Sequence, residues 1–381
     1  MHKQLKSLFL LDPKITYLNH GSFGACPKPI FNSLISWQKL LEKEPVKFLD
    51  QNLYQYLEDS RKSLSKYINC NKDDIVFCPN PSTALNTVIK SLKLNSSDEI
   101  LTSDHEYGAL DRTWNFICKK TGAKYIKQKI SLPLNSKENF IDSFLSGVNK
   151  KTKVIFLSHI TSSTGLIFPA QEICDFAKQK GILCIIDGAH VPGHIALDIK
   201  KLNPDIYTGA CHKWMCAPKG TSFLYVAKEL QTKIDPLIVS WGYESDEPSH
   251  SQFLDYHQWQ GTRDMSAFLT MPTVINFLKD NNWNEISKIC KKNTIIARDK
   301  INNFLNSEPI CDNKFLGQMA SIQIKHDNPK SIYEMLYKKY KIQIPLFIWK
   351  DTTFLRFSMQ AYNSMDDIDR LIVALKNILK Q

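Results

Sequence analysis

The sequence predicts an α/β fold, in which a large domain with a mainly parallel, seven-stranded sheet precedes a smaller C-terminal α+β domain. Three observations support this prediction. Short apolar runs alternate with helical segments between about residues 75 and 226, which is typical of parallel strands joined by crossover helices. The apolar run Leu183–Ile186 stops at Asp187 and Gly188, as a buried strand does where it delivers a side chain to the sheet edge. After about residue 264 the alternation ends.

The expected strands of the large sheet are short, and most are followed by a turn and a helix. They are Ile75–Cys78, Glu99–Thr102, Ala123–Ile126, Val154–Leu157, Leu183–Ile186, Asp205–Thr208 and Ser222–Val226. One expected helix begins near Ser82 and carries Leu85, Val88, Ile89 and Leu92 on a single face. Others cover residues 29–43, Phe140–Val148 and Pro169–Lys180.

The C-terminal part is expected to contain fewer strands and longer helices. Its elements are a helix over Met265–Leu278 kinked at Pro272, helices near 283–306, a helix over Ser331–Lys339, strands over Ala320–Ile324, Ile342–Ile348 and Phe354–Met359, and a last helix over Asp366–Leu379. Ser364 and Asp367 have the spacing of a capping box at the start of that last helix.

These patterns divide the chain into three parts. Residues 1–16 are predicted to form an N-terminal arm associated with the small domain, residues 17–263 the large domain, and residues 264–381 the small C-terminal domain. A chain of 381 residues is long enough for two such domains.

Composition and charge argue against several classes of protein. The chain is 43% hydrophobic and 23% charged, as in ordinary globular enzymes. No apolar run approaches the roughly 18–20 residues that cross a bilayer, and Leu8–Leu11 is too short for a signal peptide. We therefore expect a cytoplasmic protein that does not bind membranes. The net charge of +11 comes from dispersed lysines, so nucleic-acid binding is not expected. The ten cysteines include no C-x-x-C pair, and we expect no metal site.

Asp187 and Lys213 form the centre of the predicted site. Asp187 follows one expected strand, and Lys213 closely follows the next strand, Asp205–Thr208. In an open α/β sheet, ligands bind outside the carboxyl ends of the strands, so the two side chains should meet over one crevice. A lysine that can hold an aldehyde as a Schiff base and a carboxylate that can keep a pyridine nitrogen protonated are what pyridoxal phosphate requires.

Two further segments are expected to contribute to this crevice. Ser82 and Thr83 lie where a helix begins, and a helix N-terminus is a site for anions such as a phosphate group. The loop at residues 17–27 is rich in glycine and polar residues, which favours close approach of its backbone to a ligand.

Five motifs occur in a fixed order along the chain. They are Leu18-Asn19-His20-Gly21-Ser22-Phe23-Gly24, Ser158-His159-Ile160-Thr161-Ser162-Ser163-Thr164-Gly165, Asp187-Gly188-Ala189-His190, His212-Lys213-Trp214 and Gly261-Thr262-Arg263-Asp264. In these motifs the sequence resembles the class V aminotransferase family of fold-type I pyridoxal phosphate enzymes, and within it the isopenicillin N epimerase-like proteins. The resemblance covers about residues 15–370.

The resemblance implies roles around the cofactor ring. Lys213 would form the Schiff base and then move the α-proton of the substrate. Asp187 would pair with the pyridinium nitrogen. His190 would contact the phenolic oxygen of the ring, and Ser162 falls where cysteine desulfurases carry an asparagine to that oxygen. Tyr107 is the expected stacking aromatic, with His105 as the alternative.

It also implies roles for the cofactor phosphate and for the substrate. Ser82, Thr83 and His212 would hold the phosphate, and Gly261 and Thr262 would reach the phosphate of the neighbouring subunit in a homodimer with shared active sites. The substrate carboxylate would bind Arg356, because a planar guanidinium can form paired hydrogen bonds. Asn19 and His20, in the N-terminal motif, are expected near the substrate.

The substrate is then expected to be an amino acid or a peptide-like amine with a free carboxylate, and the reaction class stays open. Epimerisation, transamination and elimination all begin at the same α-carbon. A basic, non-catalytic binding protein on the same fold is a further alternative. Cysteine desulfurase chemistry is disfavoured, because residues 339–353 contain no cysteine and the last one in the chain is Cys311.

Overall fold

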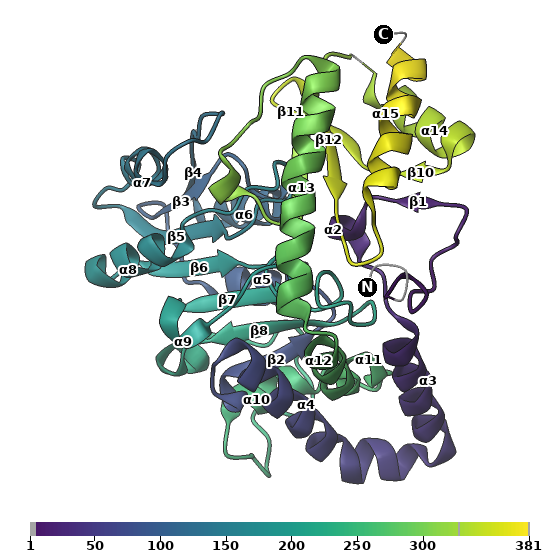
Figure 1. Ribbon diagram of the computed structural model, residues 1–381. Helices are drawn as coiled ribbons and strands as arrows, with labels where there is room; N and C mark the ends of the chain where they lie inside the picture. Colours follow the sequence, from purple (N-terminus) through teal and green to yellow (C-terminus); the bar gives the residue numbers. More distant parts are fainter. Residues whose placement is uncertain (1–4, 327, 380–381) are drawn as a thin grey trace.

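The computed structural model describes residues 5–326 and 328–379, and its largest element is a seven-stranded sheet (Figure 1). All seven expected strands are present, with ends shifted by one or two residues, so the predicted fold class is confirmed. In spatial order the strands are β2 (Ile75–Cys78), β8 (Ser222–Val226), β7 (Ile206–Ala210), β6 (Leu183–Asp187), β5 (Thr152–Ser158), β3 (Glu99–Ser103) and β4 (Lys124–Gln128).

The sheet is parallel except at β8, which is antiparallel to both of its neighbours. Its strands are largely buried on both faces, except for the edge strand β4, whose residues are exposed or half-buried. In β5, Ile155 and Leu157 join one apolar core, whereas Val154 and Phe156 join the other. This explains why the inner strands are mainly apolar runs in the sequence, since both of their faces are covered.

Helices accompany this sheet along the chain, and some of them begin shortly after a strand ends. They are α3 (Lys28–Lys43), α4 (Leu53–Ile68), α5 (Pro81–Ser91), α6 (Gly108–Thr121), α7 (Lys137–Leu145), α8 (Ala170–Lys180), α9 (Ile199–Leu202) and α10 (Gln252–Gln258). Several end where the chain turns left-handed, as α6 does at Gly122 and α8 at Gly181.

The C-terminal part contains a smaller antiparallel sheet. Its strand order is β11 (Leu346–Trp349), β12 (Thr352–Ser358) and β9 (Met319–Ile324). The long helix α13 (Trp283–Leu305) packs against β9 and against α15 (Met365–Leu379), and α14 (Pro329–Tyr340) packs against β11 and α15. Figure 1 shows these three helices beside the small sheet. Asp367 Oδ2 accepts the Ser364 N–H at 3.1 Å, which is one half of the expected capping box.

Two expected elements of this part were wrong in detail. The strand Ile342–Ile348 is divided into β10 (Ile342–Gln343) and β11, since Pro345 between them cannot donate to a sheet. The kinked helix over Met265–Leu278 is two helices, α11 (Ser266–Leu269) and α12 (Met271–Asp280). Pro272 lies in the first turn of α12, where a missing N–H is tolerated, so it begins a helix rather than bending one.

The N-terminal segment lies against the C-terminal part. Strand β1 (Thr16–Tyr17) pairs in parallel with β10. The Ser358 N–H then donates to the Leu18 carbonyl at 2.9 Å, which brings the following residues beside β12. The boundaries of the three expected parts stay a prediction.

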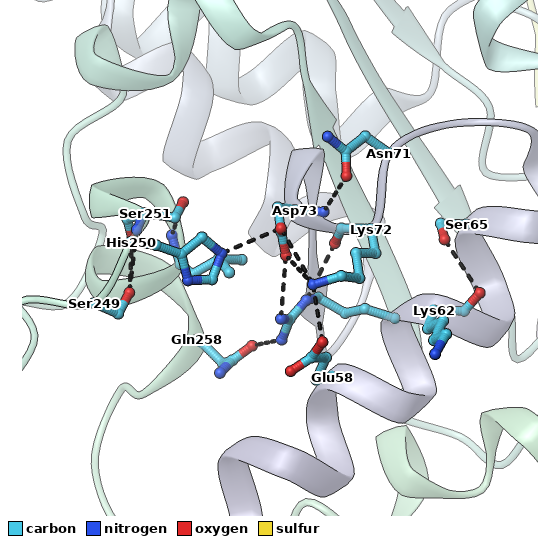
Figure 2. A network of polar contacts seen from close by, with 12 residues as sticks. Glu58, Lys62, Ser65, Asn71, Lys72, Asp73, Ser249, His250, Ser251 and Gln258 are labelled. Carbon is cyan, nitrogen blue, oxygen red and sulfur yellow. Dashed lines mark hydrogen bonds and ion pairs between the residues drawn. The ribbon is translucent and has the colours of Figure 1, made fainter.

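A polar network ties α4 to the segment that precedes α10 (Figure 2). Lys72 Nζ lies 2.9 Å from Glu58 and 3.2 Å from Asp73. Asp73 also bonds His250 Nε2 at 3.1 Å. These contacts hold the chain that leads to the loop at Gly261. Over the two described ranges, no helix has the length and apolar character that crossing a membrane requires.

Candidate active site

A cavity of about 320 Å³ lies at the carboxyl ends of β5 and β6, where an open α/β sheet binds its ligands. It receives residues from the N-terminal segment, the large sheet and β12. The lining residues are Gly21, Ser22, Phe23, Asn80, Pro81, Ser82, Tyr107, Leu110, Ser158, Ile160, Ser162, Asp187, Ala189, His190, His212, Lys213 and Arg356. The predicted pair of Asp187 and Lys213 is therefore brought together.

Asp187 is the last residue of β6 and is buried. Its Oδ1 accepts the Ala189 N–H at 2.9 Å. Burial raises the pKa of this carboxyl group, while the charge of Lys213 lowers it. Gly188 is required beside it, because a Cβ there would lie 2.1 Å from the Tyr207 hydroxyl. The strand end thus presents a carboxylate that needs a cationic partner.

Lys213 follows β7 and lies within hydrogen-bond distance of His190, with 3.0 Å between Nζ and Nε2. Burial lowers the pKa of Lys213 to about 8, and the positive charge of Arg356 acts in the same direction. An amine with this pKa exchanges protons readily near neutral pH.

The position of the proton on the His190 ring follows from its hydrogen bond with Trp214. The Trp214 Nε1–H donates to Nδ1 at 3.3 Å, so Nδ1 carries no proton. Burial, with the charge of Lys213, lowers the pKa of His190 well below its ordinary value, and the imidazole is neutral. The single proton is therefore assigned to Nε2, which can donate to a ligand oxygen in the cavity.

The N-terminus of α5 forms one end of the cavity. Asn80 caps the helix and accepts the Thr83 N–H at 2.8 Å and the Thr83 hydroxyl at 3.1 Å. Ser82 lines the cavity, whereas Thr83 is held by the cap. His212 also lines the cavity, and its Nδ1 is 2.9 Å from the Thr221 carbonyl. Such a helix end attracts an anion, since its N–H groups and its dipole both favour negative charge.

Arg356 enters the cavity from β12 as a buried cation. Its Nη2 donates to Ser22 Oγ at 2.7 Å, and Nη1 donates to the Ser162 carbonyl. Its Nε is buried without a partner, and no carboxylate contacts the side chain within the described ranges. Burial lowers the pKa of Arg356 to about 10. A buried guanidinium in this state is suited to receive an anionic ligand group.

The structure separates the two candidates for the stacking aromatic. Tyr107 caps α6, is 45% exposed and lines the cavity. His105 is fully buried, with Nδ1 2.9 Å from the Thr164 hydroxyl and Nε2 3.0 Å from the Ile130 carbonyl. Only Tyr107 is available to a ligand.

Four other predicted residues lie outside the cavity. His20 is buried behind the lysine, with Nε2 3.0 Å from the Lys213 carbonyl and Nδ1 2.9 Å from the Tyr362 hydroxyl. Asn19 precedes it, and the N-terminal motif thus supports the backbone of Lys213. Gly261 and Thr262 lie on a loop after α10 and do not line this cavity.

Sequence reasoning missed several lining residues. Asn80 could have been found, because an asparagine before a proline is a common start of a helix. Ser22 and Phe23 lay in a motif already singled out, but nothing in the pattern showed which side chains face the ligand. Ser158, at the end of β5, likewise begins a motif already singled out, but it was not expected in the site. Within residues 5–326 and 328–379, no group of three or more metal-ligating side chains is present.

Comparison with known proteins gives matches over nearly the whole chain. Residues 43–371 match the protein-family model described as Aminotransferase class-V. The chain is 29% identical to the isopenicillin N epimerase of Amycolatopsis lactamdurans, over 97% of this chain and 96% of the relative. It is 24% identical to a probable chloroplastic L-cysteine desulfhydrase of Arabidopsis thaliana, over 97% and 84%. A solved structure of a lysine-to-alanine mutant of C-DES, with glycine covalently linked to the PLP cofactor, is 19% identical, with a TM-score of 0.83 over 98% of both chains.

Proposed function

This chain belongs to the aminotransferase class-V family of pyridoxal phosphate enzymes, and we propose that it acts at the α-carbon of an amino acid or a peptide-like amine with a free carboxylate. The resemblance in sequence to isopenicillin N epimerases favours inversion of configuration at that carbon. The identity of the side chain on the substrate is not part of the proposal.

The observation that carries this proposal is the charge of the cavity. Two cations, the buried Arg356 and the half-buried Lys213, face a single carboxylate, Asp187. A partly enclosed cavity with excess positive charge is unfavourable until anions enter it. The cofactor phosphate and the substrate carboxylate are two such anions, and each has a separate group of donors.

The residues present fit pyridoxal phosphate. Ser82, His212 and the N-terminus of α5 would hold its phosphate, and Asp187 would keep its ring nitrogen protonated. His190 would donate its Nε2–H to the ring oxygen, and Lys213 would hold the aldehyde carbon. When bound, the cofactor supplies a ring that accepts the electrons left on the α-carbon.

The side chains of this protein then perform three tasks. Arg356 binds the substrate carboxylate and so fixes which bond at the α-carbon faces the ring. Lys213, with a pKa of about 8, takes the α-proton from one face of the α-carbon, and inversion results when a proton is then delivered to the opposite face. Tyr107 packs over the cofactor and keeps water from one face of the cavity.

Elimination of a β-substituent is the second candidate reaction. It is favoured by the similarity to plant proteins named L-cysteine desulfhydrase. The same residues would serve it, since removal of the α-proton comes first in both reactions. No cysteine lines the cavity among the described residues, which argues against a protein-bound persulfide.

The reaction is tested by incubating the holoenzyme with a panel of L-amino acids and short peptides in deuterated water. The proposal expects deuterium at the α-carbon together with loss of configuration. Accumulation of a keto acid would instead identify transamination, and release of thiol or sulfide would identify elimination. If no member of the panel exchanges its α-proton, the proposed activity at the α-carbon is wrong.

Attachment of the cofactor is tested separately. After borohydride reduction, the peptide that contains Lys213 should carry the mass of the cofactor, and Lys213→Ala should abolish this adduct. Lys219→Ala is the matched control, because Lys219 lies on the same segment and donates to the Gly24 carbonyl instead. An adduct that persists in Lys213→Ala would refute the assignment.

The proposal includes a homodimer and a cytoplasmic location. Gly261 and Thr262, which lie outside the cavity of their own chain, would approach the phosphate held by the partner subunit. Light scattering of the purified protein tests the dimer. A mixed dimer of one Thr262→Trp chain and one Lys213→Ala chain tests the shared site. If each site takes Lys213 from one chain and Thr262 from the other, one of the two sites in this dimer contains both unchanged residues and should be active.

A further inference from the structure

Glu106 is a buried acid next to the cavity that the proposed reaction does not use. It lies between β3 and α6, directly before Tyr107, and is 5% exposed. Its Oε1 is 2.5 Å from the Ser103 hydroxyl. Its Oε2 accepts the Ser158 N–H at 3.0 Å and the Ser158 hydroxyl at 2.6 Å. One carboxyl group thus connects three segments of the chain.

Two of these three segments, those of Tyr107 and Ser158, line the cavity. Ser103 is the last residue of β3, and Ser158 is the last residue of β5, the neighbouring strand. Ser158 lies opposite Asp187 in the pairing of β5 with β6, and it lines the cavity. Because Tyr107 is the next residue in the chain, the hydrogen bonds of Glu106 also fix the backbone position from which the Tyr107 ring extends.

Two acidic groups act on the carboxyl group of Glu106, namely Asp187 on β6 and Asp111 on α6, and Glu106 acts in turn on Tyr125 on β4. No ion pair involves Glu106 within residues 5–326 and 328–379. Burial raises the pKa of Glu106 to about 8. The hydrogen bonds from Ser103 and Ser158 oppose this rise, and the two aspartates add to it.

A protonated carboxyl group keeps all of these contacts. Its O–H can be donated to Ser103 Oγ, while Oε2 continues to accept both donors of Ser158. An ionised Glu106 would place a second negative charge close to Asp187 in a buried region. The neutral form therefore satisfies both the hydrogen bonds and the electrostatics.

We propose that Glu106 is a positioning residue, which acts as an uncharged carboxyl group to hold Tyr107 and Ser158 in place around Asp187. This leaves Asp187 as the one carboxylate beside the cofactor ring. The inference depends on the proposed function only in that a pyridoxal phosphate ring occupies the cavity, and not on the reaction that follows.

The test compares Glu106→Gln and Glu106→Ala with the wild-type holoenzyme. A glutamine amide has the shape of the neutral acid, can donate to Ser103 and can accept both donors of Ser158. Alanine leaves the Ser158 N–H without a partner. Glu99→Gln is the matched control, because Glu99 lies at the other end of β3 and bonds Asn149 at 2.7 Å.

The first measurement is the infrared band of protonated carboxyl groups at about pH 6.5. The wild type and Glu99→Gln should show a band that Glu106→Gln lacks. If the band is the same in Glu106→Gln, Glu106 is ionised and the proposal is overturned. This measurement needs no substrate, so it is independent of whether the proposed reaction takes place.

The second measurement is the visible circular dichroism of the bound cofactor as a function of pH. Glu106→Gln should match the wild type at pH 6.5 and lack a change that the wild type shows near pH 8, where Glu106 ionises. Lys213 titrates in the same range, but its contribution is common to both proteins. Glu106→Ala should retain the cofactor about tenfold more weakly, because the ring loses its aromatic contact. If the dichroism signal of Glu106→Gln at pH 6.5 resembles that of Glu106→Ala, the negative charge of Glu106 is required and the proposal is overturned.

Discussion

Replacing Lys213 with methionine should stabilise the cofactor-free protein. Burial lowers the pKa of Lys213 from its ordinary value of 10.5 to about 8, and each pKa unit corresponds to about 1.4 kcal/mol. Keeping this amine charged therefore destabilises the folded protein by about 3 kcal/mol at neutral pH. Methionine is similar in volume to the neutral amine but, unlike that amine, cannot accept the Nε2–H of His190, which costs about 1 kcal/mol. The expected net gain is about 2 kcal/mol.

The pH dependence of this gain has a definite sign. The folded-state pKa lies below the unfolded one, so the unfolded wild type binds more protons between about pH 8 and pH 10.5. The stability of the wild type should rise with pH over this window, and the advantage of Lys213→Met should shrink. By about pH 9.5 the two proteins should be nearly equal in free energy of unfolding.

The assay is urea unfolding of the cofactor-free proteins at equal concentration, followed by circular dichroism at pH 7 and about pH 9.5. Lys228→Met, at an exposed lysine, is the control and should change little. Added pyridoxal phosphate should then stabilise the wild type more than Lys213→Met. A variant that is no more stable than the wild type at pH 7, or a gain that does not depend on pH, would refute the reasoning.

Three further substitutions test other parts of the site. Asn80→Ala removes the cap that bonds Thr83 and should lower the free energy of unfolding by about 1 kcal/mol, with weaker cofactor retention, measured by melting with and without pyridoxal phosphate. Arg356→Lys should lower kcat/KM for carboxylate substrates by ten- to a hundredfold, since a bond to a charged group is worth about 1.5–3 kcal/mol; an unchanged KM would contradict the assignment. Gly24→Ala, at φ +63° with its Cβ 2.0 Å from the His212 carbonyl, should destabilise the protein by more than about 1 kcal/mol in the same melting assay.

The sequence by itself determined the large sheet and the pair at its edge. Both faces of the sheet are buried along its inner strands, so most strands are apolar runs that can be recognised locally. Asp187 and Lys213 follow neighbouring strands, and parallel strands end at the same edge, which made their meeting predictable from chain order alone. The start of α5 near Ser82 was also local, because a helix end is specified by the residues around it.

Only the tertiary structure decided which side chains face the ligand. Tyr107 and His105 are two residues apart and chemically similar choices, yet one lines the cavity and the other is buried between Thr164 and Ile130. His20 belongs to a motif near the site, but packing turns it towards the Lys213 carbonyl and away from the cavity. Contacts of this kind join residues far apart in the chain. They depend on how the small sheet and the N-terminal segment pack on the large sheet. The spacing of apolar residues within one segment does not predict this packing.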